Sequence, residues 1–390
     1  MTGVRRITLP ALIDAHVHFR EPGLTHKATM ASESRAAFAG GVHTVCEMPN
    51  TIPPTVTIAA LADKVRRADE IESVDLRFFF GATQAAHIVT LKELFTGSAA
   101  DLVRLRQRCC GVKLYLDHST GDQGIDASLL DEAFAAVAEL GIVAVCHCED
   151  PATNAAAAAQ EVHPGADVAV HALARPPSSE DIAVARAIAL AHTHGARLHI
   201  AHLSTKEALD RVRAAKADGL PVTCEVAPHH LFLTVDDFAH LGTLAKMNPP
   251  LRTREHQEAL WEGVADGTVD CIATDHAPHT LAEKRAGEPL KAPSGVPGVE
   301  TMLPLLLTVA ADAWPHPSSR RPTTARLTYE DIERLCFMSP NTIFRLGKDP
   351  LADRLTIDVT IPWVIHAAAL SGACGWTPYD GWQMIGKVVE

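Results

Sequence analysis

The sequence has no Lys/Arg-rich run, no long uninterrupted apolar stretch and no C-x-x-C pair. Acidic residues outnumber basic ones by 47 to 35, which gives a formal net charge of −12. This balance argues against nucleic acid or an anionic membrane as the main partner, but it is compatible with a small anionic substrate held by local cations. His, Asp or Glu interrupt the apolar stretches, and residues 1–10 lack the apolar core of a secretory signal. We therefore predict no transmembrane span and no signal peptide.

The nine cysteines are scattered and odd in number. This pattern favours free thiols in a reducing cytosol over a disulfide framework, so we expect a cytoplasmic protein. Cys146 and Cys148 flank His147. On a strand, both would face away from the histidine, so we interpret them as small hydrophobic residues under the helices rather than as metal ligands.

Short apolar or β-branched runs alternate with alanine-rich stretches along most of the chain. Eight β-then-α units predict a closed parallel (β/α)₈ TIM barrel. A doubly wound sheet is the alternative, although it would spread the candidate ligands described below along a row. The predicted strands are 11–19, 43–49, 76–82, 111–116, 142–148, 197–203, 222–228 and 270–275. The predicted helices are 27–39, 57–70, 90–107, 127–140, 178–195, 205–218, 254–266 and 299–313.

The chain ends are expected to form a separate element. We predict a hydrolase barrel over residues 11–348, and a small β element packed on it from residues 1–10 and 349–390. Residues 328–346 suggest two further short helices. Three connections are longer than a barrel needs, which is typical of binding or closure loops and also of tolerated insertions: 149–177, 229–253 and 276–298.

His16 and His18 end the first predicted strand. Side chains two apart on a strand point the same way, so the two imidazoles converge on one point, as a divalent metal such as zinc requires. For an isolated pair, two histidines on a solvated strand face would be the better interpretation. Further ligand-type residues at later strand ends weaken that alternative.

Candidate ligands recur in four of those later strands. Lys113 lies in the fourth strand, His147 and His202 end the fifth and sixth, and Asp275 ends the eighth. Each also has an interpretation without metal: the histidines could lie in the core, the lysine could have a charged partner, and the aspartate could cap a helix. Together they would meet at the carboxyl-terminal mouth of a barrel. Four imidazoles and a carboxylate are too many for one catalytic zinc but suit two.

Several motifs carry a resemblance to a known family. The chain is similar to the dihydroorotases of the amidohydrolase superfamily, including the dihydroorotase domain of the animal multifunctional pyrimidine-synthesis protein. The more specific matches are H-F-R-E-P-G, M-P-N-T and D-H-A-P-H-T, starting at His18, Met48 and Asp275. The other matching stretches are 14–17, 111–115, 224–230, 248–252, 281–284 and 298–302.

The resemblance implies reversible cyclisation of N-carbamoyl-L-aspartate to L-dihydroorotate plus water, a step of de novo pyrimidine (UMP) synthesis. It implies a zinc-bridging hydroxide, with Asp275 as general base and then acid. One zinc would bind His16, His18, Lys113 and Asp275, and the second would bind His147, His202 and Lys113. The resemblance also implies that Lys113 is an N6-carboxylysine bridging the two Zn²⁺ ions.

For the substrate, the resemblance implies that Arg20, Asn50 and His279 hold the carboxylate, and that Asn248 contacts the ring. A surface salt bridge for Arg20 and a turn role for Asn50 are the alternatives. We interpret Glu225, His229 and His230 as supports behind the metal ligands or an extra metal contact, with core packing favoured. We expect a flexible loop at Asp117–Asp122, where Ser119 or Thr120 would touch substrate or simply form a turn.

Two other functions remain open. Allantoinases and hydantoinases share the fold and metal set, but their substrates lack the ring carboxylate that Arg20 would bind. A metal-free scaffold partner of aspartate transcarbamoylase is the second alternative, opposed by retention of all the ligand-type residues. Ala201 stands where the animal domain has a cysteine, so no third metal is expected there. Family habit suggests a homodimer, possible association with a transcarbamoylase, and no nucleic-acid or membrane partner.

Overall fold

The computed structural model describes residues 5–117 and 123–389. Ser119 and Thr120, predicted to lie in a substrate-side loop, fall outside the described residues. Eight parallel strands form one sheet in sequence order. The sheet closes where His18 N–H donates to the carbonyl of His276 at 2.7 Å, which confirms the predicted barrel. The strands are β2 (Leu12–Val17), β3 (Val42–Glu47), β4 (Asp75–Gly81), β5 (Cys109–Tyr115), β6 (Val143–His147), β7 (Arg197–Ile200), β8 (Val222–Val226) and β9 (Cys271–Ile272).

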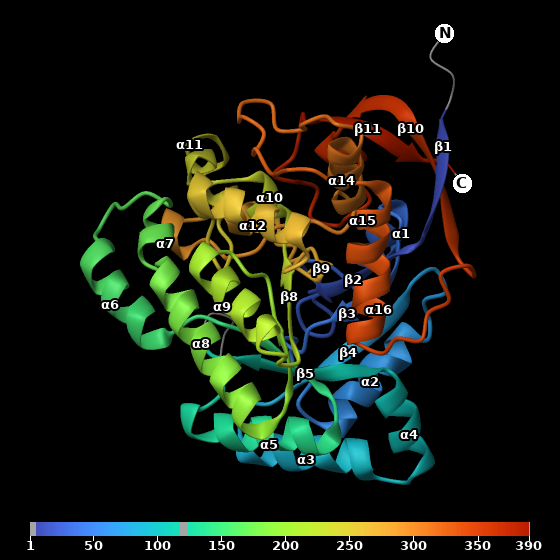
Figure 1. Cartoon of the computed structure of the whole chain (residues 1–390), viewed down its shortest axis with the longest axis vertical. Helices are drawn as coiled ribbons and strands as arrows, with labels where there is room; N and C mark the ends of the chain where they lie inside the picture. Colours follow the sequence, from blue (N-terminus) through green and yellow to red (C-terminus); the bar gives the residue numbers. More distant parts are fainter. Residues whose placement is uncertain (1–4, 118–122, 390) are drawn as a thin grey trace.

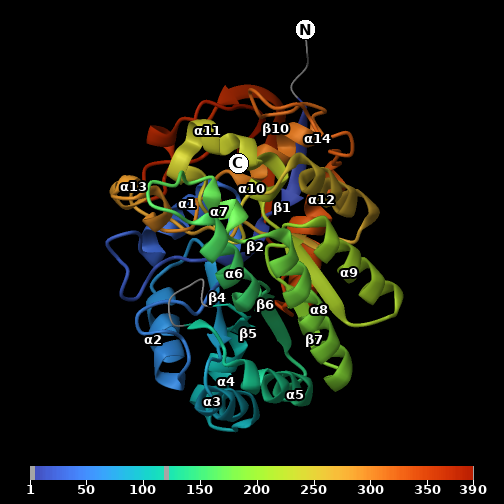
Figure 2. The ribbon, with the colours of Figure 1, turned by 90° about the vertical axis from the view of Figure 1, so that its left-hand side faces the viewer.

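Helices follow the strands and surround the barrel; in Figure 2, β4 to β7 run between α2 and α8. The helices that follow the barrel strands are α1 (Met30–Ala39), α2 (Ile58–Ala68), α3 (Ala85–Thr96), α4 (Ala100–Gln107), α5 (Leu130–Leu140), α8 (Pro177–His194), α9 (Lys206–Ala217), α12 (Arg254–Asp266) and α14 (Met302–Ala310). No helix among the described residues is long and apolar enough to cross a membrane.

One helix prediction was wrong in detail. The single helix expected over 90–107 is two helices, because the backbone of Gly97 is extended (φ −65°, ψ 143°) and ends α3. The two short helices expected in 328–346 are present, and a π-helical turn joins them. They are α15 (Tyr329–Glu333), the turn Arg334–Met338 and α16 (Ser339–Ile343).

Apolar side chains fill both sides of the barrel wall. The interior holds a cluster that includes Ile13 and Phe79, and residues of the α16 region such as Phe344 join it. Cys146 and Cys148 belong instead to the large cluster between the strands and the helices, as predicted. Burial on both faces explains why the strands read as continuous apolar runs in the sequence.

The chain ends meet in a second sheet. β1 (Arg6–Pro10), β10 (Arg354–Val364) and β11 (Gln383–Val388) form an antiparallel sheet in that order, which confirms the predicted terminal β element. Figure 1 shows β10 and β11 in red beside the blue β1. Leu9, Ile357 and Met384 pack into the same cluster as the barrel helices. The domain boundary at residue 348 therefore stays a prediction, since the core is continuous across it.

The three long connections carry short helices of their own. They are α6 (Pro151–Glu161) and α7 (Val170–Leu173) in the first, α10 (Pro228–Phe232) and α11 (Phe238–Leu241) in the second, and α13 (Leu281–Arg285) in the third. All three connections contribute side chains to one cavity at the barrel mouth.

Candidate active site

One cavity of about 1050 Å³ opens at the barrel mouth. Nine of the ten predicted site residues line it: His16, His18, Arg20, Asn50, His147, His202, Asn248, Asp275 and His279. The tenth, Lys113, is buried beside it, with its Nζ 5.0 Å from the ring centroid of the cavity residue Tyr115. Residues from distant parts of the sequence thus share one hollow.

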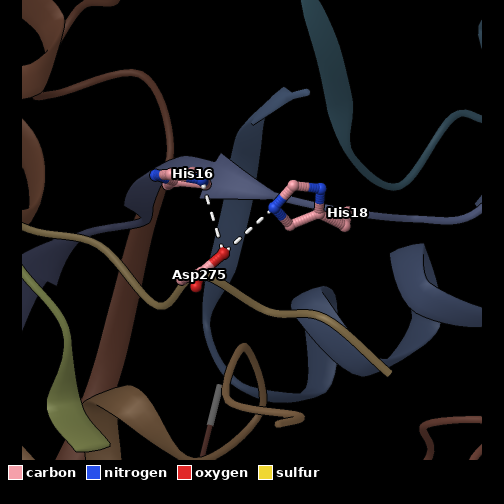
Figure 3. A group of neighbouring side chains, drawn as sticks. All are labelled: His16, His18 and Asp275. Carbon is pink, nitrogen blue, oxygen red and sulfur yellow. Dashed lines mark hydrogen bonds and ion pairs between the residues drawn. The ribbon is translucent and has the colours of Figure 1, made fainter. Parts of the chain in front are cut away.

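His16, His18 and Asp275 form the first ligand group (Figure 3). Oδ1 of Asp275 lies 3.0 Å from His18 Nε2 and 3.4 Å from His16 Nε2. Burial would raise the pKa of Asp275, but His16 and then His18 outweigh it and hold that pKa well below its usual range. A carboxylate thus faces two imidazole nitrogens in a buried site.

The far nitrogens of both rings face oxygen acceptors. His16 Nδ1 lies 2.5 Å from Glu225 Oε1, and His18 Nδ1 lies 2.6 Å from Asn50 Oδ1. Burial lowers the pKa of His18 to about 4, so its ring is neutral at pH 7. A divalent cation between His18 and Asp275 would take the Nε2 lone pair that is left when the ring donates its N–H to Asn50.

His147 and His202 form a second pair. His147 Nδ1 faces His202 Nε2 at 3.0 Å, and His147 Nε2 lies 2.8 Å from Glu149 Oε2. A carboxylate only accepts hydrogen bonds, so the Nε2 atom of His147 carries the hydrogen. Its Nδ1 atom is then left with a lone pair. The His16 and His202 ring centroids are 5.2 Å apart, so this pair adjoins the first group.

The Lys113 amine lies over the ring of Tyr115, and among the described residues it has no carboxylate ion-pair partner. Its Nζ is buried and has no hydrogen bond to any of the described residues, and His202 Nδ1 is in the same condition. Burial lowers the pKa of Lys113, which increases the share of neutral amine. An orphaned buried amine among electron-rich ligands fits carboxylation and metal bridging better than it fits a structural role.

A second group of potential ligands has a different explanation. Asp117, His147 and Glu149 come close enough to hold a cation. Arg175 already occupies that position: it donates to both oxygens of Glu149, at 2.8 and 2.6 Å, and to Asp117. Burial would raise the pKa of Glu149, but Arg175 and then His147 lower it far below its ordinary value. The guanidinium therefore neutralises Asp117 and Glu149, and Glu149 supports His147.

Arg20 and His279 form a cationic corner. Arg20 Nη2 lies 3.0 Å from His279 Nε2, and Lys27 Nζ lies 3.0 Å from His279 Nδ1. Burial, then Arg20 and Lys27, lower the pKa of His279 far below its ordinary value, so the ring is neutral. A neutral imidazole offers one lone pair, whereas Arg20 and Lys27 can only donate. In addition, the carbonyl oxygen of Ser294 accepts the hydrogen of His279 Nε2. The corner thus has donors in excess, as an anion-binding site requires.

Backbone conformation marks the same residues. Arg20, His202 and Asp275 are not glycine, yet their φ angles are 68°, 34° and 48°. Such conformations are costly and concentrate at functional sites. The predicted strand over 11–19 is shorter in the structure, because β2 ends at Val17 and Arg20 lies beyond it. A left-handed turn carries Arg20 to the cavity.

Sequence reasoning missed several supporting residues. Glu149 was detectable, because it lies two residues after His147 and so faces the same way. No repeating sequence pattern pointed to Arg175, His171 or Lys246, because they lie on the connections between the barrel strands and helices. Glu225 contacts His16 and also accepts from His199 Nε2 and from the backbone N–H of His202. Its role behind the metal ligands stays a prediction.

His229 and His230 are buried, which is compatible with the favoured packing interpretation. His230 Nε2 lies 3.0 Å from the carbonyl of Pro249. Burial lowers the pKa of His229 to about 4, so this ring is neutral at pH 7.

Known proteins resemble the chain over almost its whole length. A family model described as dihydro-orotase-like matches residues 5–208. A dihydroorotase of Halobacterium salinarum is 42% identical over 383 residues, covering 96% of this chain and 82% of that protein. The chain belongs to the dihydroorotase family. A second dihydroorotase, from Anaplasma phagocytophilum, is 35% identical over 98% of this chain and 81% of its own length.

Solved structures agree on the fold. The L-hydantoinase (dihydropyrimidinase) of Arthrobacter aurescens superposes with a TM-score of 0.88 at 27% identity, covering 98% of this chain and 83% of that one. Sequence identity to the dihydroorotases is higher than to this hydantoinase. Within the cyclic amidohydrolases, the chain is therefore placed with the dihydroorotase family.

Proposed function

We propose that the chain catalyses the reversible cyclisation of N-carbamoyl-L-aspartate to L-dihydroorotate and water. The observation that carries this choice is the Arg20 corner of the cavity. Burial lowers the pKa of Arg20 only to about 10, so the guanidinium stays charged at pH 7. Its Nη1 makes no hydrogen bond to any residue in 5–117 or 123–389. A charged fork with donors to spare suits a carboxylate, which dihydroorotate has and hydantoin and allantoin lack.

We assign the carboxylate of the substrate to Arg20 and Asn50, with His279 beside Arg20 as the family resemblance implies. Asn50 Oδ1 accepts from His18, so its Nδ2 group is the one available to an anion. Asn248, on the connection 229–253, would contact the ring of the substrate. These contacts would fix the scissile amide beside Asp275 in the geometry that cyclisation and hydrolysis share.

Asp275 is the proposed proton carrier. Its low pKa keeps it ionised at neutral pH, as a base requires. In the hydrolytic direction its carboxylate would take a proton from the attacking water and deliver it to the leaving ring nitrogen. In the biosynthetic direction the same oxygen would remove the proton from the ureido nitrogen.

The donor set fits a pair of divalent metal ions. His16, His18, Asp275 and carboxylated Lys113 would hold one Zn²⁺, and Lys113, His147 and His202 the other. When bound, such a pair supplies Lewis acidity toward the amide carbonyl and lowers the pKa of water. Glu225, Asn50 and Glu149 would keep three of the four histidines in the tautomer that offers a lone pair to metal.

We further propose a cytoplasmic, homodimeric enzyme that can associate with an aspartate transcarbamoylase. The nine cysteines, all free thiols, support a reducing compartment. Dimerisation and the transcarbamoylase rest on the family resemblance alone.

A substrate comparison tests the proposed activity. Zinc-loaded protein is assayed with dihydroorotate, dihydrouracil, hydantoin and allantoin, and with carbamoyl aspartate in the reverse direction. We expect kcat/KM to be highest for dihydroorotate, and ring closure to be measurable with carbamoyl aspartate. Preference for hydantoin or allantoin would refute the proposal in favour of the alternative enzymes.

A further inference from the structure

The proposed mechanism does not use His171, a residue of α7. It is buried, and its Nε2 lies 3.0 Å from the carbonyl oxygen of Met247 and 2.9 Å from Oδ1 of Asn248. His171 belongs to the first long connection, whereas Asn248 belongs to the second. Both side chains line the active-site cavity. The contact thus ties a substrate-facing amide to a residue far away in sequence.

The backbone carbonyl fixes the hydrogen on His171. A carbonyl oxygen only accepts, so Nε2 must carry the hydrogen that Met247 receives. Burial, then the charges of Lys246 and Arg175, lower the pKa of His171 to about 3, so the ring is neutral and has one N–H. Nε2 is therefore a donor, shared between Met247 and Asn248.

The fixed donor determines which way the Asn248 amide faces. Its oxygen must be the atom at 2.9 Å from His171, since the amide nitrogen there would set two donors against each other. The Nδ2 group is then turned to the other side. Across residues 5–117 and 123–389 no hydrogen bond involves Asn248 Nδ2, although the side chain lines the cavity.

We propose that His171 is a positioning residue that locks the Asn248 amide with its Nδ2 hydrogens toward a carbonyl oxygen of the substrate ring. The inference rests on the proposed function, because it assumes a cyclic ureide in the cavity. Without this lock the amide could rotate by half a turn and present an oxygen to the same carbonyl. His171 therefore acts on substrate binding through Asn248 and does not touch the reacting atoms.

A neighbouring contact holds α7 in place for this role. Arg252 Nη1 donates to the carbonyl of Arg175 at 2.5 Å, and so joins the same two connections a second time. Arg175 is in turn anchored by Glu149 next to His147. The position of His171 is thus fixed relative to both Asn248 and the ligand group.

The test is a kinetic comparison of His171→Leu, His171→Gln and His163→Leu. Leu removes the donor, Gln retains one, and His163 is an exposed histidine on the same connection that serves as the matched control. For dihydroorotate we expect His171→Leu to raise KM about five- to tenfold with little change in kcat, the loss of one neutral hydrogen bond. His171→Gln should recover part of this loss, and His163→Leu should match the wild type. Zinc per chain should be equal in all of them.

A double-mutant cycle separates positioning from a general structural role. If His171 acts through Asn248, adding His171→Leu to Asn248→Ala should leave KM where Asn248→Ala alone has put it. Asn248→Asp should raise KM more than Asn248→Ala does, because an anionic acceptor then faces the ring carbonyl. An unchanged KM in His171→Leu, or an equal rise in both backgrounds, would overturn the inference.

Two further outcomes are covered by the same design. If His171→Leu shows no cooperative thermal unfolding, the comparison of Asn248→Asp with Asn248→Ala decides, since both keep His171; an aspartate variant no worse than alanine overturns the inference. If the wild type does not turn over dihydroorotate, the proposed function fails. The KM comparisons are then made with whichever cyclic ureide the wild type hydrolyses.

Discussion

Replacing Arg20 by Met should convert a carboxylate-selective enzyme into one that is nearly indifferent to the carboxylate. Methionine keeps the apolar stem of the side chain and removes the guanidinium. Arg20 Nε is committed to the carbonyl of Pro278 at 3.0 Å, and Nη2 contacts His279. Since the Nε2–H of His279 is donated to Ser294, Nη2 finds no acceptor there, and the hydrogens of Nη1 and Nη2 are the donors left for substrate.

The size of the effect follows from those donors. Two hydrogen bonds to a charged acceptor are worth about 3 kcal/mol or more, which is roughly a hundredfold or greater loss in kcat/KM for dihydroorotate. Dihydrouracil has the same ring without the carboxylate, so its kcat/KM should change less than about threefold. The structure therefore predicts a selective loss rather than a general one.

The assay measures both substrates in parallel with wild type, Arg20→Met and Arg66→Met. Arg66 is an exposed arginine on α2, with its side chain 60% accessible, and is a matched control for the same chemical change. Zinc per chain and thermal unfolding are recorded for each variant. An equal loss for dihydroorotate and dihydrouracil would refute the assignment of Arg20 to the carboxylate, and so would no loss for either.

Three further predictions concern other parts of the site. Asp275→Asn should lower kcat in both directions by at least about a hundredfold. Zinc per chain should fall less than twofold, because three of the four proposed ligands to the first metal remain. A parallel loss of zinc and activity would contradict a proton-transfer role. Protein stripped of metal by chelation should regain activity on adding zinc only with bicarbonate present, since the neutral amine of Lys113 must add CO₂; full recovery in CO₂-free buffer would rule out the carboxylated bridge. Glu33→Gln should destabilise the fold by about 2 kcal/mol at pH 7 in urea unfolding. Burial raises the pKa of Glu33, but His276, Ser32 and the backbone N–H of Ala373 together offset this and hold the pKa below 4.5. The wild-type advantage should therefore be complete above pH 4.5 and shrink below it, and a constant difference would show that the Glu33 charge is not involved.

The barrel was predictable because its signal is local and repeated. Strands covered on both faces are apolar throughout, and the predicted strand at 222–228 matches β8 to within two residues. The period of two along a strand also placed His16 on the cavity side. The terminal sheet could be anticipated only as a β element, because its pairing of β1 with β10 joins residues more than 300 positions apart.

The contacts that support the ligands carry no such signal. Asn50 faces His18, and Arg175 faces Glu149, through connections whose shape depends on the rest of the fold. Gly97 also shows the limit of sequence patterns: a helical composition continues on both sides of it, yet its extended backbone ends α3 there, and only a residue without a Cβ fits so close to Leu102. Periodicity thus predicted the framework, while the orientation of the ligands follows only from tertiary packing.

Diffraction from crystals of zinc-loaded protein, recorded at the zinc absorption edge, addresses the bridged metal pair most directly. We predict two anomalous peaks per chain. One should lie among His16, His18 and Asp275 and the other beside His147 and His202, with added density joining Lys113 Nζ to both. An unmodified Lys113 side chain turned away from both peaks, in protein that cyclises carbamoyl aspartate at full rate, would contradict the account.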